Sequence, residues 1–475
     1  MPETVTCACP AGAELMGRHG RGILDATRVA NEFLRAHGEE ELLRRVGTTV
    51  TEVPSVDHLT KGVFQESYGG RTAGPPDDVL TGYGLFFITE QRTLMLDCTA
   101  GHYQMTWGYQ HPVLDGAVRD GMAAGIVPDD HSNIPGPAVK RLSYKLVELC
   151  NPDDEAIRNC DASTLDGRDD VPNTVLLGIV TGSVACSTAL KIMLMHHERA
   201  KTVPPVMVTL EGNYHGTDML AQRMRGLWER YFANVEFVNI EPNDVPAAER
   251  VFAQYGERIM GFMLEPVMMN REAILVEPEF AQAMRRLCTE AGALMAVDEI
   301  QTGFWLPGCF HYKLWDIVPD LVICGKGMAA GFHPLSAAIY RRPLDLLAQY
   351  DSISTNGNAP LAAYVALHSI GMIEADADRI GDIAQAYETM LHEVARAHPA
   401  ALKGVHGQGF LSGLKFHTVP HALGFHTRCV DAGLWVRAHA YHEGHSTVLT
   451  KFALTLSEPV IEHVRGVFTS VLAAL

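Results

Sequence analysis

The sequence predicts an α/β protein built around a mostly parallel sheet, and two observations carry this prediction. Beyond residue 110, short runs rich in apolar and β-branched residues alternate with helical patterns, and most of these runs lack the polar alternation of a half-exposed strand. Strands that are apolar on both sides and alternate with helices indicate a parallel sheet covered on both faces. In such sheets, ligands bind beyond the carboxyl ends of the strands.

The composition limits what the chain can be. Its 475 residues are 47% hydrophobic and 20% charged, which predicts a globular protein with a large core and two or three domains or lobes. The formal net charge of −18 argues against nucleic acid as the main partner. Apolar runs fall short of the roughly 18 residues of a membrane span, and the first residues lack an export signal. We therefore expect a cytoplasmic protein with reduced thiols and no membrane partner.

Two patterns precede residue 110. Residues 23–46 are helix-prone, and a break rich in Gly and Pro follows at 68–78. The stretch LFFITEQRTLMLDCTAG (85–101) predicts a hairpin of two short strands around a polar turn.

The strands of the main sheet are predicted at 174–180, 205–210, 235–240, 259–265, 293–299 and 320–325. Helix-like segments, such as 279–292, lie between most of them. From about residue 370 the pattern indicates a smaller α+β part, with a long helix at 376–397, a Gly-rich strand entry at 404–416, another helix, and a final strand and helix. The acidic, breaker-rich stretch 152–172 is expected to be a surface loop.

Charged side chains follow two of the predicted strands. Asp298 and Glu299 come directly after one apolar run, and Lys326 follows the next run between two glycines, Gly325 and Gly327. A carboxylate at a strand end is either a cap or turn residue or a ligand group, and taken alone the cap is the commoner case. In a parallel sheet, however, both strand ends face the same crevice.

Two further turns follow predicted strands. In IVTGSVACSTALKIM (179–193), Thr-Gly-Ser opens a helix whose backbone N–H groups suit a phosphate; the alternative is a plain helix cap by Thr181 or Ser183. In EGNYHGTDM (211–219), Tyr214 is either a surface turn residue or a ring that stacks on a planar ligand.

A lysine, an acid, an aromatic face and a phosphate cradle together fit pyridoxal 5'-phosphate. The acid keeps the pyridine nitrogen of the cofactor protonated, and the lysine must lose its proton to form an imine, which a buried site favours. The flanking glycines are expected to leave room for the flat cofactor. We therefore predict that the chain binds pyridoxal 5'-phosphate.

With these motifs in place, the sequence resembles the class III aminotransferase family, which includes ornithine, GABA and ω-amino acid aminotransferases and glutamate-1-semialdehyde aminomutase. The resemblance runs from roughly residue 80 to the carboxyl terminus. The segments that carry it are WGYQHP, TGSVACSTALK, NYHGTD, MLEPVMMN, VDEIQTGF, DLVICGKGMAAGFHPLSA and STNGNAPLAA. Each is weak alone, and as a set they are specific.

The resemblance implies a role for each matching residue. Lys326 is the Schiff-base lysine, Asp298 the partner of the pyridine nitrogen and Tyr214 the stacking ring, and these are the catalytic candidates. Gln301 lies near the ring hydroxyl, Gly182 and Ser183 hold the phosphate, Thr355 reaches the phosphate of the neighbouring subunit, and Glu265 lies on the substrate side.

The resemblance also implies the architecture. We expect the pyridoxal phosphate-dependent transferase fold of type I, with a large domain around a mostly parallel seven-stranded sheet and a small α+β domain from both termini. The expected division is an N-terminal extension and first part of the small domain at 1–110, the large domain at 111–365, and the rest of the small domain at 366–475. A homodimer with a shared active site follows.

Several positions depart from the family pattern. Val184 replaces a usual Glu, WLPG (305–308) replaces Gly-Arg-Thr-Gly, and Lys451 stands where many relatives have a carboxylate-clamping arginine. A lysine cannot make the bidentate clamp of an arginine. The substrate-binding candidates are Tyr103, Trp107, Glu265 and Lys451, with His102 beside them; for the residues of the 102–107 loop the alternative is packing at the dimer interface.

A histidine-rich stretch raises the question of a metal-binding site. His439, His442 and His445 have H-x-x-H-x-x-H spacing, but this spacing does not place all three on one helical face. We expect a solvated loop there and no metal site.

The implied function is an enzyme that acts on an amino acid or amine through an external aldimine and a quinonoid intermediate. We expect an aminotransferase with an unusual substrate. The alternatives are a β- or γ-elimination, replacement, carbon–carbon bond-forming or aminomutase enzyme of specialised biosynthesis, or a cofactor-binding regulator; retention of Lys326, Asp298 and Tyr214 together weakens the last.

Overall fold

The computed structural model describes residues 12–15, 17, 19–56, 78–158, 165, 167–231, 234–438 and 444–475. Within these ranges, none of the helices combines the length and hydropathy that a membrane span requires.

The main sheet has seven strands in the order β4-β12-β11-β10-β7-β5-β6. Their bounds are β4 Thr174–Ile179, β5 Val206–Leu210, β6 Glu236–Ile240, β7 Ile259–Leu264, β10 Leu294–Asp298, β11 Leu321–Cys324 and β12 Ser336–Tyr340. β12 runs antiparallel to β11 and β4, whereas the other neighbours pair in parallel. The predicted mostly parallel sheet is confirmed, and β12 is the strand that the sequence patterns missed.

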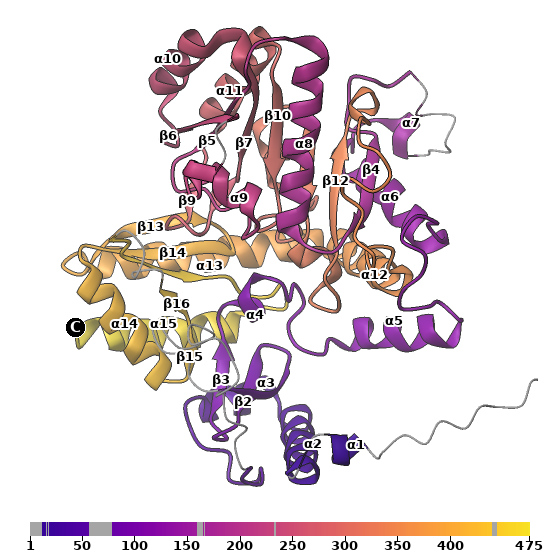
Figure 1. Ribbon diagram of the computed structural model, residues 1–475. Helices are drawn as coiled ribbons and strands as arrows, with labels where there is room; N and C mark the ends of the chain where they lie inside the picture. The colour runs from indigo at the N-terminus through magenta and orange to yellow at the C-terminus, as the bar shows by residue number, and fades with distance from the viewer. Residues whose placement is uncertain are drawn as a thin grey trace, which may run out of the picture.

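Both faces of this sheet are buried, because successive side chains alternate between two cores. In β10, Met295 and Val297 join the core that includes α11 (Pro278–Ala291), whereas Leu294 and Ala296 join the core of α8 (Gly182–Ala200). In Figure 1, α8 crosses in front of the sheet. The strands are therefore apolar on both sides because both faces of the sheet are covered, as the sequence predicted.

A second part of the molecule joins the two ends of the chain. Its antiparallel sheet, in the order β13-β14-β17-β16, contains β13 Leu402–Gln408, β14 Leu411–Phe416, β16 Arg437–Ala438 and β17 Thr447–Thr450. The amino-terminal hairpin of β2 (Phe86–Thr89) and β3 (Leu94–Asp97) pairs with β1 (Val79–Tyr83), and β15 (Leu434–Trp435) adds in parallel to β3. A smaller α+β part from both termini is thus confirmed.

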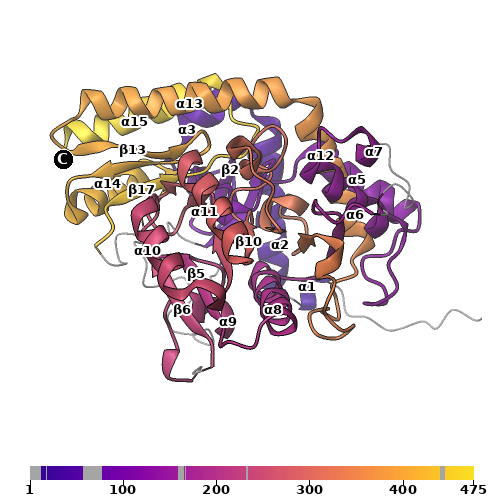
Figure 2. The same cartoon turned by 90° about the horizontal axis from the view of Figure 1, so that it is seen from above.

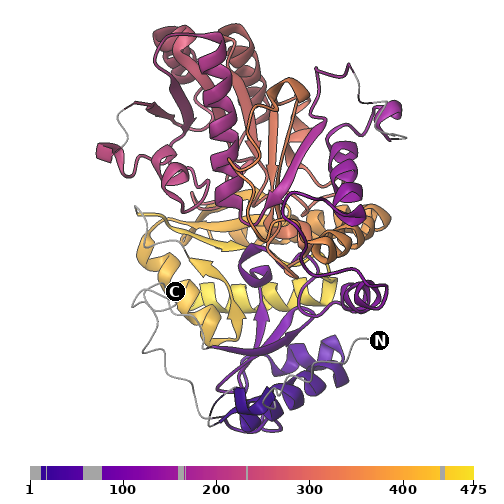
Figure 3. The ribbon, with the colours of Figure 1, turned by 45° about the vertical axis from the view of Figure 1, so that its right-hand side comes forward.

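Helices cover this part. They are α2 Gly20–Ala36, α3 Glu39–Arg45, α13 Ala377–Ala397, α14 Val419–Asp431 and α15 Glu458–Ala473. α13 and α15 run side by side (Figure 2), and the amino-terminal α3 contacts the carboxyl-terminal α15 below the small sheets (Figure 3).

Besides short 3-10 helices, the described residues contain these further elements: α1 Gly12–Leu15, α4 Ala100–Tyr103, α5 Pro112–Ala123, α6 Pro137–Cys150, α7 Glu155–Arg158, α9 Met219–Met224, α10 Val245–Tyr255, α12 Pro360–Ala375, and the short hairpin of β8 Val267–Met268 and β9 Ile274–Leu275. α12 packs against α5, α6 and the short 3-10 helix that begins at Lys326. It therefore supports the lysine segment from behind.

The expectation of a surface loop at 152–172 holds only in part for its described residues. Most of them lie in turns or coil and most are exposed, but the stretch contains the four-residue helix α7, and Ile157 and Leu165 are buried against Val147 of α6. Two apolar side chains at separated positions form this small core, and the many charges around them hid the signal. Residues 159–164 and 166 lie outside the described residues.

Candidate active site

The carboxyl ends of adjacent strands bring the predicted residues together. Glu265 follows β7, Asp298 ends β10, and Lys326 follows β11 by one residue. Because β7, β10 and β11 are parallel neighbours, these side chains reach the same edge of the sheet. The turns after β4 and β5 open at this edge as well.

A cavity of about 210 Å³ lies at this edge. It is lined by His102, Tyr103, Gly182, Ser183, Tyr214, His215, Gly216, Asn270, Asp298, Ile300, Gln301, Lys326 and Arg437. Seven of the predicted site residues are in this set: Tyr103, Gly182, Ser183, Tyr214, Asp298, Gln301 and Lys326.

Lys326 has an unusual backbone and an altered charge equilibrium. Its φ of +37° is uncommon for a residue with a side chain. Burial lowers the pKa of Lys326 to about 8, although the Asp298 carboxylate opposes the shift. The neutral form of this amine is therefore more accessible near neutral pH than in a solvated lysine.

The two glycines beside Lys326 are needed by the protein itself. A Cβ on Gly325 would lie 2.6 Å from Oγ of Ser336, and one on Gly327 would lie 2.2 Å from a ring carbon of Trp305. The expectation that these glycines leave room for the cofactor is corrected: they leave room for neighbouring protein side chains.

Asp298 lies in a buried hydrogen-bonded group. Its Oδ2 accepts from Nδ1 of His215 at 2.8 Å and from Sγ of Cys186 at 3.2 Å, and its Oδ1 accepts from the N–H of Ile300 at 3.0 Å. Burial alone lowers the pKa of His215, but the hydrogen bond to Asp298, together with the negative charges of Asp298 and Glu265, raises it above its ordinary value. The surroundings therefore favour a cationic or proton-donating imidazole at His215.

Glu265 lies behind the cavity wall and connects two residues that line it. Its Oε1 accepts from the N–H of Tyr214 at 2.8 Å, and its Oε2 accepts from Nε2 of Gln301 at 3.3 Å. Burial raises the pKa of Glu265 to about 7, against the opposing charge of His215. Glu265 therefore positions neighbours from outside the cavity lining.

The other strand-end acid points elsewhere. Oε1 of Glu299 accepts from the N–H of Tyr312 at 2.8 Å, and Oε2 accepts from Thr302 Oγ1. Glu299 is a buried structural residue, as the cap-or-turn alternative anticipated.

Close backbone packing forms the cradle at the start of α8. Gly182 and Ser183 open this helix, and Oγ of Ser183 accepts from the N–H of Thr217 at 3.0 Å. Gly216 has a φ of +126°, and a Cβ there would lie 2.3 Å from Oγ of Ser183. The turn after β5 is thus held against the positive end of the helix dipole.

Another part of the cavity wall is made by Tyr103, His102 and Arg437. The guanidinium of Arg437 donates to the imidazole of His102, which must accept in its neutral form because arginine has no acceptor. The Arg437 guanidinium carbon also lies 5.7 Å from the centroid of the Tyr103 ring. This wall therefore presents positive charge and hydrogen-bond donors.

Like Glu265, the substrate-binding candidates Trp107 and Lys451 do not line the cavity. Trp107 is buried within its own chain, where its Nε1 donates to Oγ of Ser369 at 3.0 Å. Lys451 is fully buried, and its Nζ donates to the main-chain oxygen of Gln301 at 2.5 Å. The structure does not bring Lys451 to the place of a carboxylate clamp.

Two other candidates lie elsewhere. Thr355 is exposed and borders a separate cavity with residues 129–132. Of the histidine-rich stretch, His439 and His442 lie outside the described residues, and His445 is buried rather than solvated.

Sequence reasoning missed Arg437 and Asn270 and gave His215 no role of its own. His215 was in view as part of the Tyr-His-Gly motif, and its partner Asp298 supplies the role. Arg437 is on the two-residue strand β16, which is too short to produce a pattern. Only the tertiary fold brings it beside His102.

Comparisons with known proteins bear on the family and the fold. The sequence profile described as aminotransferase class-III matches residues 78–472. The chain is 28% identical over 258 residues to the mitochondrial ornithine aminotransferase of Arabidopsis thaliana, covering 51% of this chain and 54% of that protein. It is 26% identical to the glutamate-1-semialdehyde 2,1-aminomutase of Aeropyrum pernix, covering 59% and 62%. The chain thus matches little more than half the length of these relatives.

Solved structures extend the likeness in fold. A transaminase from the marine bacterium Virgibacillus superposes with a TM-score of 0.73 at 17% identity, covering 86% of this chain and 96% of that one. An aminotransferase from Vibrio fluvialis, solved in its PMP-bound form, superposes with a TM-score of 0.71 at 20% identity, covering 83% and 92%. The predicted fold class is confirmed.

Proposed function

The chain belongs to the class III aminotransferase family, and on this premise we propose that it is a pyridoxal phosphate-dependent enzyme that transfers the amino group of an amino acid. The observation that carries the proposal is the cavity that collects Lys326, Asp298 and Tyr214. Its amine has a lowered pKa, and its acid is held by a protonatable histidine.

The residues of the cavity fit this cofactor. Oε1 of Gln301 is buried at the cavity without a hydrogen-bond partner among the described residues, which suits a ring hydroxyl. Gly216 and the first turn of α8 form a cradle without side-chain bulk at the helix N-terminus, which suits a phosphate. When bound, the cofactor supplies an electron sink for the carbanion formed at the substrate.

The residues at the cavity then have separate roles. Lys326 would attach the cofactor through Nζ and, when free, would accept a proton from the α-carbon of the substrate. Asp298 would partner the pyridine nitrogen, and His215 holds that carboxylate in place. Tyr214 would lie against the ring, with its N–H fixed by Glu265.

Arg437 supports an amino acid over a simple amine as the substrate. It lines the same cavity as the phosphate cradle, and an arginine there can bind a carboxylate through two hydrogen bonds. His102 accepts from it and fixes its direction. The name of the relative ornithine aminotransferase gives an amino acid as its substrate, which agrees with this assignment. The departures at Trp305 and Lys451 favour a substrate that differs from theirs.

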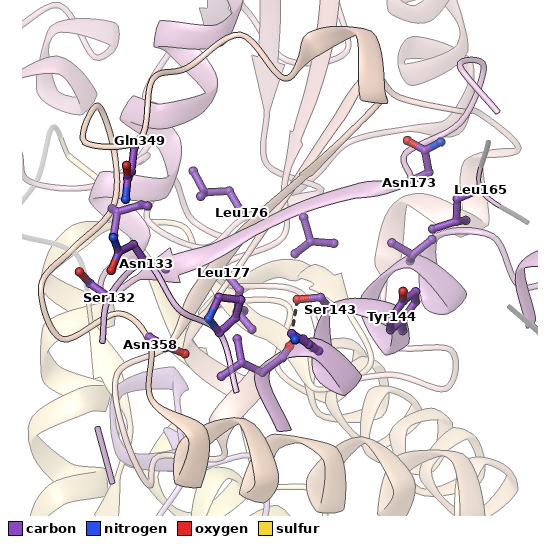
Figure 4. A pocket seen from close by; sticks show the side chains of 17 residues that line it. Ser132, Asn133, Ser143, Tyr144, Leu165, Asn173, Leu176, Leu177, Gln349 and Asn358 are labelled. Atoms are coloured by element: carbon purple, nitrogen blue, oxygen red, sulfur yellow. Dashed lines mark hydrogen bonds between the residues drawn. The ribbon is translucent and has the colours of Figure 1, made fainter. Parts of the chain in front are cut away.

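A homodimer is part of the proposal. Thr355 is exposed and lies outside the cavity of its own chain, which suits a residue that serves the partner's phosphate. Beside it, a cavity of about 590 Å³ opens between α6, β4 and the loop 349–358, with Leu176, Leu177 and Tyr144 in its lining (Figure 4). Exposed Ile134 and Tyr350 add apolar surface nearby, and contiguous apolar surface of this kind favours burial by a partner. The division at residues 110 and 365 remains part of the same proposal.

A single-turnover experiment tests the function. The cofactor-loaded protein is mixed with a panel of amino acids and amines, and the absorbance of the cofactor is followed without any amino acceptor. Conversion to pyridoxamine phosphate is the expected result. An unconverted cofactor together with a released substituent indicates elimination instead, and full turnover by Lys326→Ala would overturn the assignment.

A further inference from the structure

Lys451 is a buried lysine, and the stability of the fold does not explain why a lysine occupies this position. Its side chain is fully buried, and among the described residues no carboxylate forms an ion pair with it. Burial lowers the pKa of Lys451 well below its ordinary value. An apolar side chain of the same length avoids this desolvation, so its presence indicates a function.

The contacts of the Lys451 side chain connect it to residues at the cavity. Nζ donates to the main-chain oxygen of Gln301 at 2.5 Å and lies 3.5 Å from the centroid of the Trp305 ring. Either protonation state of the amine has an N–H for the oxygen and another for the ring face. Lys451 thereby fixes the backbone of Gln301, whose side chain lines the cavity and donates to Asn270 at 3.0 Å.

Trp305 continues this connection to the reactive lysine. Its ring lies against Gly327, directly after Lys326, so closely that even a Cβ on Gly327 would collide with it. Its Nε1 donates to the main-chain oxygen of Phe452 at 3.0 Å, the residue after Lys451. The indole therefore touches the Lys326 segment and Lys451 at once.

We propose that Trp305 and Lys451 act together as positioning residues that fix Lys326 relative to Gln301. Both are departures from the family pattern, and their contact makes them one feature of the structure. This inference rests on the proposed function. It says that Trp305 and Lys451 set the distance between Lys326, which would attach the cofactor, and Gln301, which would contact the cofactor ring. Neither residue lines the cavity itself.

A double-mutant cycle with Lys451→Met and Trp305→Phe tests the pair. We expect Lys451→Met to lower kcat about tenfold with little change in KM, because small displacements at reacting groups are costly. The visible circular dichroism of the bound cofactor should change, and the double variant should lose no more than Lys451→Met alone. Urea unfolding of the cofactor-free Lys451→Met chain should show no loss of stability, since a buried amine has been removed.

Lys201→Met is the matched control. Its Nζ also donates to a main-chain oxygen, that of Ala291, at 3.0 Å, and burial also lowers its pKa, but it lies outside the cavity. This variant should keep the kcat and the dichroism of the original protein.

The outcomes separate this inference from the proposed function. Unchanged kcat and dichroism in a folded Lys451→Met overturn the positioning role, while the original protein still turns over. If Lys451→Met does not fold, Trp305→Phe decides, and unchanged dichroism there overturns the proposal. If the original protein binds no cofactor, the proposed function itself has failed.

Discussion

At the scale of single residues, Lys326 combines a strained backbone with a destabilised charge. Its left-handed conformation and its burial both cost stability, and burial also lowers the pKa of its amine. Proteins keep such costs mainly at functional sites, so the lysine itself can be examined through the stability of the chain.

The pH dependence of stability follows from this lysine. In the folded, cofactor-free chain the pKa of Lys326 is about 8, below its unfolded value of about 10.4. Below pH 8 both states are protonated and the folded state carries the full cost of a buried ammonium; this cost falls as the pH rises toward 10. Lys326→Met should therefore stabilise the cofactor-free chain most below pH 8. Urea unfolding at a series of pH values measures this, and a gain that is constant with pH contradicts it.

The proposed carboxylate-binding role of Arg437 predicts which amino donors bind well. Arg437→Met should raise KM roughly 10- to 100-fold for donors with a carboxylate, because a charge-assisted pair is lost. For amines without a carboxylate, KM should change little. Steady-state kinetics on matched pairs of donors measure this difference. Arg271→Met, which removes a surface ion pair with Glu241, serves as the control, and an equal rise for both donor types contradicts the role.

At the scale of elements, the turn 100–103 is the most strained segment of the site. Ala100, His102 and Tyr103 all have positive φ, at 46°, 71° and 71°, and Gly101 lies between them at 58°. Asp97 holds this left-handed turn: its oxygens accept from the N–H of Thr99 and from the N–H of Gly101, each at 2.8 Å. The turn carries His102 and Tyr103 to the wall of the cavity.

Asp97→Ala should release this turn. We expect KM for the amino donor to rise about tenfold while the affinity for the cofactor stays within about twofold, since the substrate wall moves and the cradle does not. Titration of the cofactor-free protein and steady-state kinetics give the two values. Tyr109→Phe removes one of the donors to Asp97 and should have a smaller effect. A parallel loss of cofactor affinity would show that the turn supports the whole site.

The sequence anticipated the elements whose signal is local. The predicted strands of the main sheet are apolar runs of β-branched and aliphatic residues, and the structure has them within about a residue or two. Strand β12 (SAAIY) was not predicted, because its small residues lower its strand propensity, although the strand is wholly buried. Lys326, Asp298 and Gly216 belong to motifs on strand ends. Arg437 and the contact of Trp305 with Lys451 depend on distant segments meeting, which no local pattern encodes.

At the scale of the whole molecule, the proposed homodimer gives the exposed Thr355 a role in the site of the partner subunit. If each site borrows this residue, neither Lys326→Ala nor Thr355→Ala alone yields a normal subunit. A hybrid dimer of the two variants contains one site with both residues intact.

This hybrid gives a direct measurement. Mixing the two variants by unfolding and refolding together should restore normal cofactor affinity in one site per hybrid dimer, up to half the activity of the original dimer. Each variant refolded alone should stay impaired at limiting cofactor. No gain on mixing contradicts a shared site.

The antiparallel strand β12 has a consequence for how the reactive amine is kept in reach. β11 and β12 are hydrogen-bonded neighbours, with Cys324 opposite Ala337, so the segment that carries Lys326 is a closed loop tied at both ends to the sheet. If Lys326 attaches the cofactor as proposed, this short closed loop keeps the released amine at a high effective concentration at the cavity. Reattachment would then be an intramolecular step, favoured by the hydrogen bonds that tie β12 to β11.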